Sequence, residues 1–237
     1  MNHAPGYALL ATCLSLLTAA PALTQDDRSP QEWLRLANEG NLKANMVVCG
    51  GYLGGAAGFA KDISKAFPFC KVYADETGNP VAQTVVANLY QQGHGVARND
   101  AKAAKYSRLA AHQGNAAAQF ALGNMHHHGR GVEKDLVEAR KWYERAAAQD
   151  HAAGLTYLGN FHYRGLGGLP EDHARAARLY RRAADLGHAQ AQGNLAHLLE
   201  HGKGVPKDIE EAKRLYKLAA EQGNKTAAAN FRRLAGQ

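Results

Sequence analysis

Apolar residues recur along this chain at the spacing of an α-helix. In AQTVVANLYQQG, residues 82–93, the large apolar side chains stand at Val85, Val86, Leu89 and Tyr90, an i, i+1, i+4, i+5 pattern. This spacing puts them on one face of a helix with 3.6 residues per turn. Gly93 follows, and glycine accepts the left-handed conformation found at helix C-termini without steric cost. The pattern therefore predicts an amphipathic helix that ends at Gly93.

This helix and its glycine belong to a repeat of 36 to 37 residues. Gly-x-Gly recurs at 93/95, 129/131, 165/167 and 202/204, and an acidic residue follows at Asp100, Asp135, Asp172 and Asp208. Aligned on the first glycine, four units span 82–117, 118–153, 154–190 and 191–226, and a degenerate unit spans 44–81. A period in this range predicts a solenoid of helix pairs, here called helix A and helix B.

Helix B of each unit is expected to begin at the acidic residue. Asp135-x-x-Glu138 and Asp208-x-x-Glu211 have the form of capping boxes, in which the Asp satisfies free N–H groups and the Glu reaches back. In unit 44–81 we expect Pro68 to interrupt helix B, because proline lacks the N–H that an inner helical turn needs.

The two ends of the chain are expected to differ from the units. Residues 1–22 have the apolar run and the small-x-small site of a signal peptide, so we expect cleavage near Ala22 and a periplasmic or secreted protein. Nothing later is long and apolar enough to cross a membrane. Ser29-Pro30-Gln31-Glu32 predicts a single helix B within 23–43. Residues 227–237 predict a polar terminal helix A, which keeps a repeat array soluble.

Composition and charge narrow the class of partner. Apolar residues make up 46% of the chain but aromatic residues only 8%, so the core depends on alanine and favours close helix packing. The formal net charge of +7 favours an acidic partner. Basic residues gather on helix B, where they form either a solvated face or a contact for an acidic protein or an anionic envelope surface. An exported chain without an aromatic stacking platform is not expected to bind nucleic acid, and we expect a monomer.

The units resemble a known repeat. The pattern is carried by Leu122-Gly123, Gly129-x-Gly131-Val132, Asp135, Ala139, Trp142-Tyr143 and Ala146-Ala147, and again by Gly202-x-Gly204-Val205, Asp208, Ala212, Tyr216 and Ala219-Ala220. It resembles the Sel1-like repeat, a relative of the tetratricopeptide repeat. The resemblance implies an all-α fold, a right-handed α-solenoid of helix-turn-helix repeats that acts as an adaptor. Exported bacterial members include envelope regulators, host-contact factors and immunity proteins.

Two cysteines remain after the leader, Cys49 and Cys70. In the unit alignment Cys49 takes the place of Gly123 on helix A, and Cys70 takes the place of Tyr143 on helix B. An oxidising compartment and this pairing favour a disulfide that joins the two helices. The alternative is two small buried thiols, and the resemblance to cysteine-rich relatives favours the bond.

The chain shows no familiar catalytic motif. G-x-S-x-G, H-E-x-x-H, C-x-x-C and the P-loop are absent from the sequence. Each Gly-x-Gly follows a predicted helix, whereas a dinucleotide site requires a strand there. We therefore expect neither an enzyme nor a cofactor, although some cysteine-rich Sel1 relatives have been discussed as hydrolases.

The histidine run 126–128 does not predict a metal site. Consecutive helical residues diverge by about 100°, so these three side chains cannot converge on one ion. His126 shares a column with His162 and is expected to pack at the seam between helices. The alternative is a metal site that joins histidines of neighbouring units, such as His127, His162 or His197.

One face of helix A is the candidate binding surface. Positions 3, 7 and 10 of each unit share a face by i, i+4, i+7 spacing, the face that lines the concave groove of helical solenoids. The candidate groove residues are Thr84, Asn88, Gln91, Phe120, Asn124, His127, Thr156, Asn160, Tyr163, His197 and Glu200. Asparagine amides donate to and accept from a peptide backbone, and Phe120 and Tyr163 offer anchors. The alternative is that asparagine is merely typical of the family at this position.

The sequence thus predicts a non-enzymatic protein that binds a protein or peptide partner in the periplasm through this groove, as an envelope regulator or scaffold. The alternative role is an immunity protein that neutralises a toxic effector, such as a lipase or another toxin that attacks the envelope. A hydrolase is the least supported class.

Overall fold

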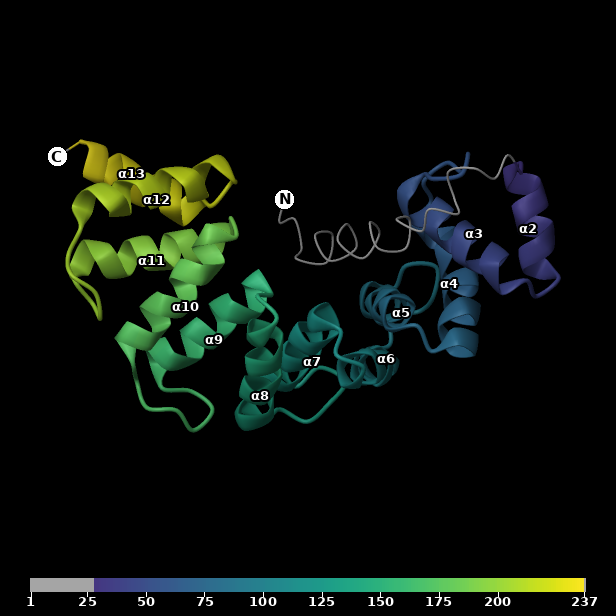
Figure 1. Cartoon of the computed structure of the whole chain (residues 1–237), viewed down its shortest axis with the longest axis horizontal. Helices are drawn as coiled ribbons and strands as arrows, with labels where there is room; N and C mark the ends of the chain where they lie inside the picture. The colour runs from purple at the N-terminus through teal and green to yellow at the C-terminus, as the bar shows by residue number, and fades with distance from the viewer. Residues whose placement is uncertain (1–27, 237) are drawn as a thin grey trace. The chain divides into compact units, whose positions relative to one another are not determined.

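The computed structural model describes residues 28–236, in which the regular elements are α-helices (Figure 1). The expected signal peptide, 1–22, lies outside these residues. The chain forms two compact units. The first holds α2 (Pro30–Asn38), α3 (Leu42–Gly54), α4 (Ile63–Thr77), α5 (Pro80–Gln92), α6 (Asp100–His112) and α7 (Ala116–His128), except that 126–128 group with the second unit. The second holds α8 (Leu136–Ala148), α9 (Ala152–Arg164), α10 (His173–Asp185), α11 (Ala189–His201), α12 (Ile209–Glu221) and α13 (Lys225–Ala235). The predicted all-α repeat fold is confirmed.

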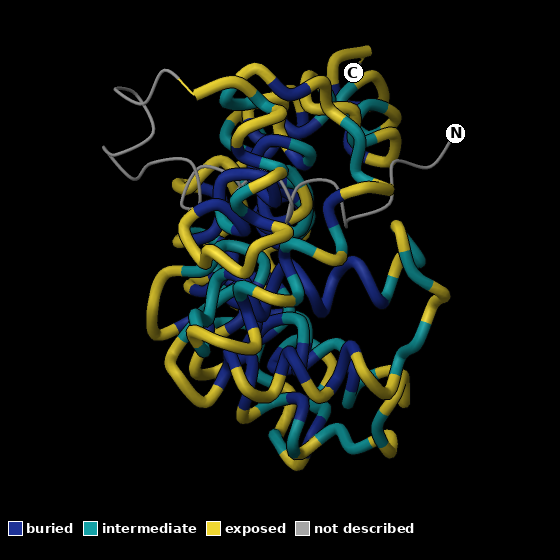
Figure 2. Tube along the Cα trace, turned by 90° about the vertical axis from the view of Figure 1, so that its right-hand side faces the viewer, coloured by how far each residue is buried: buried dark blue, intermediate teal, exposed yellow. Residues whose placement is uncertain are grey.

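The core of each unit lies along the inner sides of the helices, and the turns between them are largely exposed (Figure 2). The largest fully buried side chains include Trp33, Val47, Val48 and Leu89 in the first unit, and Tyr143, Leu155, Phe161, Leu195 and Tyr216 in the second. None of the described helices is long and apolar enough to span a bilayer.

The turn from helix A to helix B has the same construction in both units. In the α5–α6 pair, Gly93 ends helix A in the left-handed conformation with φ 73°. The Asn99 N–H then donates to the Tyr90 carbonyl at 2.9 Å and closes the turn. In the α9–α10 pair, the Asp172 N–H makes the same bond to the His162 carbonyl at 2.8 Å. The prediction that helix A ends at the first glycine is confirmed.

The second glycine of each Gly-x-Gly lies against the helix B that precedes it. In the first unit, a Cβ atom on Gly131 would overlap the carbonyl oxygen of Asp100, at the start of α6. In the second unit, a Cβ atom on Gly167 would lie 2.6 Å from the carbonyl oxygen of Leu136, at the start of α8. Only glycine permits such a close backbone approach, so each of these turns is fitted to the preceding helix pair.

Helix B begins with a side-chain cap. Asp135, Asp172 and Asp208 cap α8, α10 and α12, as predicted. At α6 the prediction is wrong by one residue, because Asn99 is the N-cap and Asp100 is the first helical residue. Asparagine caps a helix as well as aspartate does, which lets the cap move back by one position.

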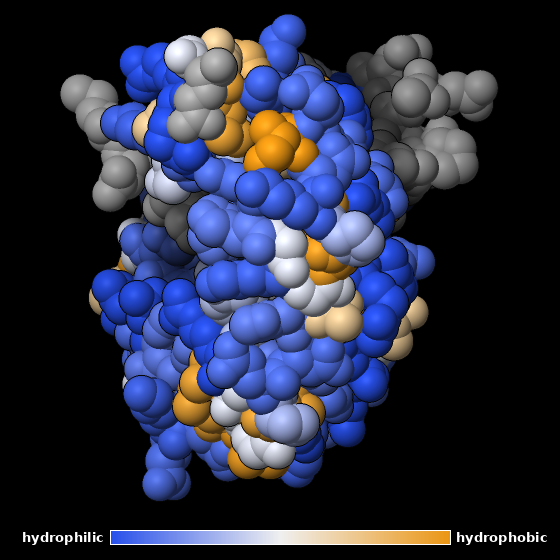
Figure 3. Space-filling model, turned by 90° about the vertical axis from the view of Figure 1, so that its left-hand side faces the viewer, coloured by the Kyte–Doolittle hydropathy of each residue, from blue (hydrophilic) through white to orange (hydrophobic). Residues whose placement is uncertain are grey.

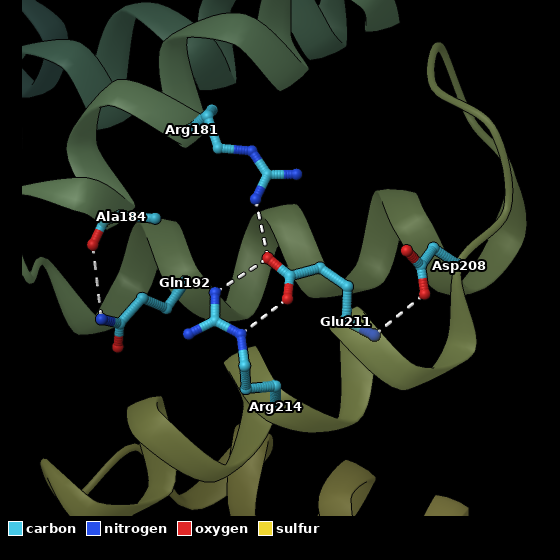
Figure 4. A network of polar contacts seen from close by, with 6 residues as sticks. All are labelled: Arg181, Ala184, Gln192, Asp208, Glu211 and Arg214. Carbon is cyan, nitrogen blue, oxygen red and sulfur yellow. Dashed lines mark hydrogen bonds and ion pairs between the residues drawn. The ribbon is translucent and has the colours of Figure 1, made fainter.

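The capping boxes predicted at α8 and α12 form only in part. The Glu211 N–H is capped, but the Glu211 carboxylate accepts from Arg181 of α10 and Arg214 of α12 and does not reach back (Figure 4). Glu138 in α8 pairs with Lys141. Charged donors compete with a capping N–H because charge-assisted hydrogen bonds are stronger. Glu211 consequently links α10 to α12.

Helix α2 is the first helix of the described residues, and it begins where the sequence predicts a helix B. Ser29 and Glu32 form the reciprocal capping box of α2. Trp33 is 1% exposed, and the charged groups of Arg28 and Lys43 lie 4.8 and 5.6 Å from its ring centroid. The Trp33 ring is thus part of the core, and the Arg28 and Lys43 side chains lie over the ring.

The α3–α4 pair contains the predicted disulfide. Cys49 of α3 and Cys70 of α4 are bonded, and their Cα atoms are 4.9 Å apart. Both residues are completely buried. The bond therefore fixes helix A to helix B at the point where the two helices cross.

The expected interruption of helix B at Pro68 is wrong, because α4 runs unbroken through this residue. Ala66, Cys70 and Ala74 form a buried face that continues on both sides of the proline. Proline removes one hydrogen bond of the helix, to the carbonyl of Ser64, but packing and the disulfide hold both halves in line. The Gly95 backbone also lies beside the Ser64 carbonyl oxygen.

Candidate partner-binding groove

Helix A of the second unit divides its residues between the core and an accessible face. In α9, Leu155, Leu158 and Phe161 are buried, whereas Asn160 and Tyr163 are half-buried. Residues three apart are neighbours on a helix surface, so Asn160 and Tyr163 share a face. With the apolar residues of α9 facing the core, Asn160 and Tyr163 therefore both point away from it.

Two adjoining hollows open over α9, α11 and α13. The first, of about 250 Å³, is lined by Asn160, Tyr163, Arg164, Tyr180, Asn194, His197 and Leu198. The second, of about 440 Å³, is lined by Gln190, Gly193, Asn194, His197, Tyr216, Asn224, Thr226, Ala227 and Asn230. Asn194 and His197 line both hollows, and we call these two hollows together the amide groove.

Hydrogen bonds fix the orientation of the central amides. The Tyr180 hydroxyl donates to Asn160 Oδ1 at 2.7 Å, and Asn194 Nδ2 donates to the same oxygen at 3.1 Å. These bonds use the acceptor of Asn160 and one donor of Asn194. Within residues 28–236, the Asn160 NH₂ group and Asn194 Oδ1 make no further hydrogen bond. The groove therefore contains a donor and an acceptor that are held in place and available to a ligand.

The carboxylate of Glu200 in α11 is paired inside the protein. It is 8% exposed, and it accepts hydrogen bonds from Tyr216 of α12 and Arg233 of α13. Burial alone would raise the pKa of Glu200, but the bonds from Arg233 and Tyr216 outweigh burial and hold this pKa below its usual value. Glu200 therefore stays ionised and paired, and it is not available as a partner contact.

Positive charge at the groove is not balanced in the same way. Arg164 and Lys203 are exposed, and neither forms an ion pair with any residue of the described chain. The Lys203 ammonium lies 6.0 Å from the centroid of the Tyr163 ring. Burial, together with the neighbouring charges of His201 and Lys203, lowers the pKa of His197, so His197 is neutral at pH 7.

Polar side chains dominate the face shown in Figure 3, where apolar residues form small separate areas. The most exposed large apolar residues of the described chain come from different parts of the fold: Leu42, Val72, Leu109, Val137 and Leu186. A partner on the face shown in Figure 3 would depend mainly on hydrogen bonds and charge.

The predicted groove residues separate into accessible and buried ones. Asn160, Tyr163 and His197 meet in the amide groove. Gln91, Asn124 and His127 are also half-buried, but they line neither hollow. The prediction of an outward orientation is wrong for the buried members, which are Thr84, Asn88, Phe120, Thr156 and Glu200. Thr84 and Thr156 donate to the carbonyls of Pro80 and Ala152, four residues earlier, so their hydroxyls are already used.

The histidines mainly contribute to packing. His127 Nδ1 lies 3.2 Å from the Tyr143 hydroxyl, and the Phe161 ring is 5.2 Å away. Burial, followed by the charge of His128, lowers the pKa of His127. His126, the residue predicted at the seam, is half-buried, and His162 of the same column is buried. Among the described residues, no three His, Cys, Asp or Glu side chains come together in a way that could hold a metal ion.

Sequence reasoning missed several groove residues. Asn194 precedes His197 by three positions and so shares its face, but the i, i+4, i+7 rule did not include it. Tyr180 and Tyr216 belong to helix B, which the rule ignored, and Arg164 follows the last position that it considered. The recurring tyrosine of helix B was a usable signal, because Tyr180 and Tyr216 both line the groove.

Comparison with protein families supports the repeat assignment. The model of the Sel1 repeat matches residues 80–115, 116–151, 152–188 and 189–224. These four segments correspond to the four regular helix pairs that begin at α5, α7, α9 and α11. The search of curated proteins found no match.

Solved structures share the fold. A protective antigen of uropathogenic Escherichia coli with an SLR fold is 32% identical with a TM-score of 0.75, covering 95% of this chain and 48% of that one. This chain thus spans about half of the antigen. A Sel1 repeat protein from Oxalobacter formigenes is 29% identical with a TM-score of 0.76, covering 94% and 86%. An immunity protein from Pseudomonas aeruginosa is 18% identical with a TM-score of 0.50, covering 93% and 83%, a likeness of fold alone.

Proposed function

Because the chain belongs to the Sel1 repeat family, we propose that it works without catalysis by binding a protein or peptide partner in the amide groove. The observation that supports this most is the Asn160–Asn194 pair, which offers an NH₂ donor and an Oδ1 acceptor. Each peptide group of an extended segment has one acceptor and one donor. The pair can therefore bind a backbone without regard to its side chains.

The proposal also covers the compartment in which the chain acts, the charge of its partner and its oligomeric state. The leader-like residues 1–22 support export to the periplasm or beyond, and the net charge of +7 supports a partner of acidic character. We propose that the chain is monomeric and meets its partner after leader cleavage near Ala22. Mass spectrometry of the mature N-terminus tests the leader cleavage, and an intact Met1 on exported protein would contradict it.

Two roles fit a partner-binding groove, regulation or scaffolding in the envelope and immunity against a delivered toxin. The Pseudomonas aeruginosa immunity protein shares only the fold with this chain. The identity of the captured partner decides between the roles. An envelope sensor or enzyme of the same cell favours regulation, and a toxin encoded beside this gene favours immunity.

A pull-down from envelope extract tests the groove. We expect the full chain to capture a partner. The amount captured should fall by at least about fivefold in Asn160→Ala and in Tyr163→Ala, the size expected for a central interface contact. Asn38→Ala, an exposed asparagine of α2 in the other unit, is the matched control and should capture normally. Equal capture by all four proteins would rule out the amide groove.

A further inference from the structure

Arg164 is the last residue of α9 and lies at the edge of the amide groove. It lines the 250 Å³ hollow, and its side chain is exposed. Several other arginines of the second unit have carboxylate partners, such as Arg181 with Glu211 and Arg233 with Glu200. Arg164 has none within residues 28–236. Its guanidinium is a planar donor group that matches a carboxylate in two-point contact.

A second cation strengthens the positive potential at this edge. Lys203 follows the C-terminus of α11 and lies over the Tyr163 ring, which lines the same hollow as Arg164. The carboxylate of α11, Glu200, is already engaged by Arg233 and Tyr216. Burial raises the pKa of the Tyr180 hydroxyl, and the charge of Arg164 opposes part of that rise.

The neutral groups of the groove favour a peptide over an inorganic anion. The ionised oxygens of a phosphate are acceptors, and they would face the Asn194 Oδ1 acceptor unfavourably. A peptide group supplies an N–H to Asn194 Oδ1 and a carbonyl to the Asn160 NH₂ group. The two amides and the arginine are thus satisfied together by one ligand that carries both a backbone and a carboxylate.

We infer that the amide groove binds an extended peptide segment with a carboxylate, whose backbone contacts Asn160 and Asn194 and whose carboxylate pairs with Arg164. This inference rests on the proposed function and names the ligand chemistry of the same groove. The carboxylate comes either from an Asp or Glu side chain or from a peptide C-terminus, and the two sources are separable by experiment.

The test uses a phage-displayed dodecapeptide library selected on the full chain. Enriched peptides are then synthesised in three forms: with their acidic residues, with each acid changed to its amide, and with a free instead of an amidated C-terminus. We expect enrichment of Asp or Glu, and a loss of affinity of about tenfold when the binding carboxylate is removed, as for a charge-assisted hydrogen bond. If the free C-terminus restores affinity to the amide form, the groove accepts either source.

Variants of the protein assign the effect to Arg164. In Arg164→Gln, the acidic and amide peptides should bind within twofold of each other, whereas Arg164→Lys should keep part of the preference. Arg178→Gln is the matched control, because Arg178 is an exposed arginine of α10 that lines neither hollow. It should leave the preference unchanged. Circular dichroism confirms that the variants are folded.

The outcomes separate the inference from the proposed function. Peptides that lose binding in Asn160→Ala, but bind equally as acid and amide, overturn the carboxylate inference and leave the groove intact. An acid preference that persists in Arg164→Gln also overturns it. If the selection yields no peptide whose binding depends on Asn160, the proposed function itself fails.

Discussion

The α3–α4 pair of the first unit and the α9–α10 pair of the second bring helix A and helix B together by different means. In α9–α10, a Cβ atom on Gly159 would come within 2.6 Å of Tyr180 Cε1, so the glycine leaves room for the tyrosine ring. In α3–α4, the aligned positions carry the bonded Cys49 and Cys70. The comparison shows that the repeat preserves the close approach of its two helices. Either a tyrosine ring packed against a glycine or a disulfide bond holds the helices together.

The surroundings of the two helix crossings explain why one has a disulfide and the other a glycine–tyrosine contact. Helix α3 is rich in glycine, and its Gly51 lies directly beside the ring of Phe59 from the following turn. Each glycine within a helix costs about 1 kcal/mol relative to alanine. The disulfide offsets part of that loss. In α9–α10 the tyrosine is held by its hydrogen bond to Asn160, which also orients the amide groove.

The strongest way to break the glycine–tyrosine crossing is Gly159→Val. The added side chain would collide with the Tyr180 ring, so we expect the free energy of unfolding to fall by about 3 kcal/mol, the upper end of the usual cost of overpacking. Urea unfolding followed by circular dichroism measures the change. Gly193→Ala in α11 is the control, because its Cβ atom would have no neighbour closer than 3.5 Å. This control should gain up to about 1 kcal/mol. Equal stability of Gly159→Val and the wild type would show that the crossing does not depend on glycine.

The covalent crossing is broken by the double change Cys49→Ala, Cys70→Ala. The two cysteines are 21 residues apart, and a loop of that size is worth about 3 kcal/mol in the chain-entropy model. Hydrogen exchange should rise in α3 and α4 and stay unchanged in α11 and α12. A reducing agent should reproduce the effect in the wild type and add nothing to the variant. Faster exchange spread evenly over both units would argue against a local role for the bond.

The units also differ in how helix A begins, and this difference predicts a pH effect. Asn41, Asn79 and Asn115 cap α3, α5 and α7 of the first unit. In the second unit Asn224 caps the terminal helix α13, but His151 and His188 are the N-caps of α9 and α11. His151 Nδ1 accepts from the Gly154 N–H at 3.1 Å, which requires a neutral ring. Burial, followed by the charge of His188, lowers the pKa of His151 to about 4 from 6.5.

Because the folded pKa of His151 lies below the unfolded one, the unfolded chain binds the proton first. The free energy of unfolding should therefore fall as the pH drops from 6.5 to about 4, by about 2 kcal/mol after allowing for partial exposure. His151→Asn should remove most of this slope, since asparagine caps at any of these pH values. Urea unfolding at several pH values measures it, and parallel curves for the variant and the wild type would contradict the assignment.

The parts of the fold that the sequence predicted correctly depend on local chemistry. Helix A ends at Gly93 and helix B begins at Asp135 because the glycine and the cap act within a few residues. The effect of Pro68 was predicted wrongly because the buried face of α4 and the Cys49–Cys70 bond are contacts with residues far away in the sequence. These contacts override the local preference of proline. The Glu211 carboxylate likewise pairs with Arg181 of another helix and does not complete the capping box of its own helix.

The groove was predicted only in part, for a similar reason. A spacing rule identifies residues on one face of a helix, but it does not say how far the next helix covers that face. Position 3 is buried at Thr84, Phe120 and Thr156, which makes the error systematic. Glu200 is covered through Arg233 of α13, whose position along the sequence gave no indication of this contact.

The glycine contact between successive turns and helices also determines where such an array can change in length. The repeat at 152–188 is one residue longer than the repeat at 116–151, and its extra residue lies between Gly167 and Asp172. There the chain has left the preceding helix, and a Cβ atom on Gly168 would meet nothing within 4 Å. Insertions and grafted loops are therefore accommodated after the second glycine, whereas a change between the two glycines would disturb the seating of that repeat on its predecessor.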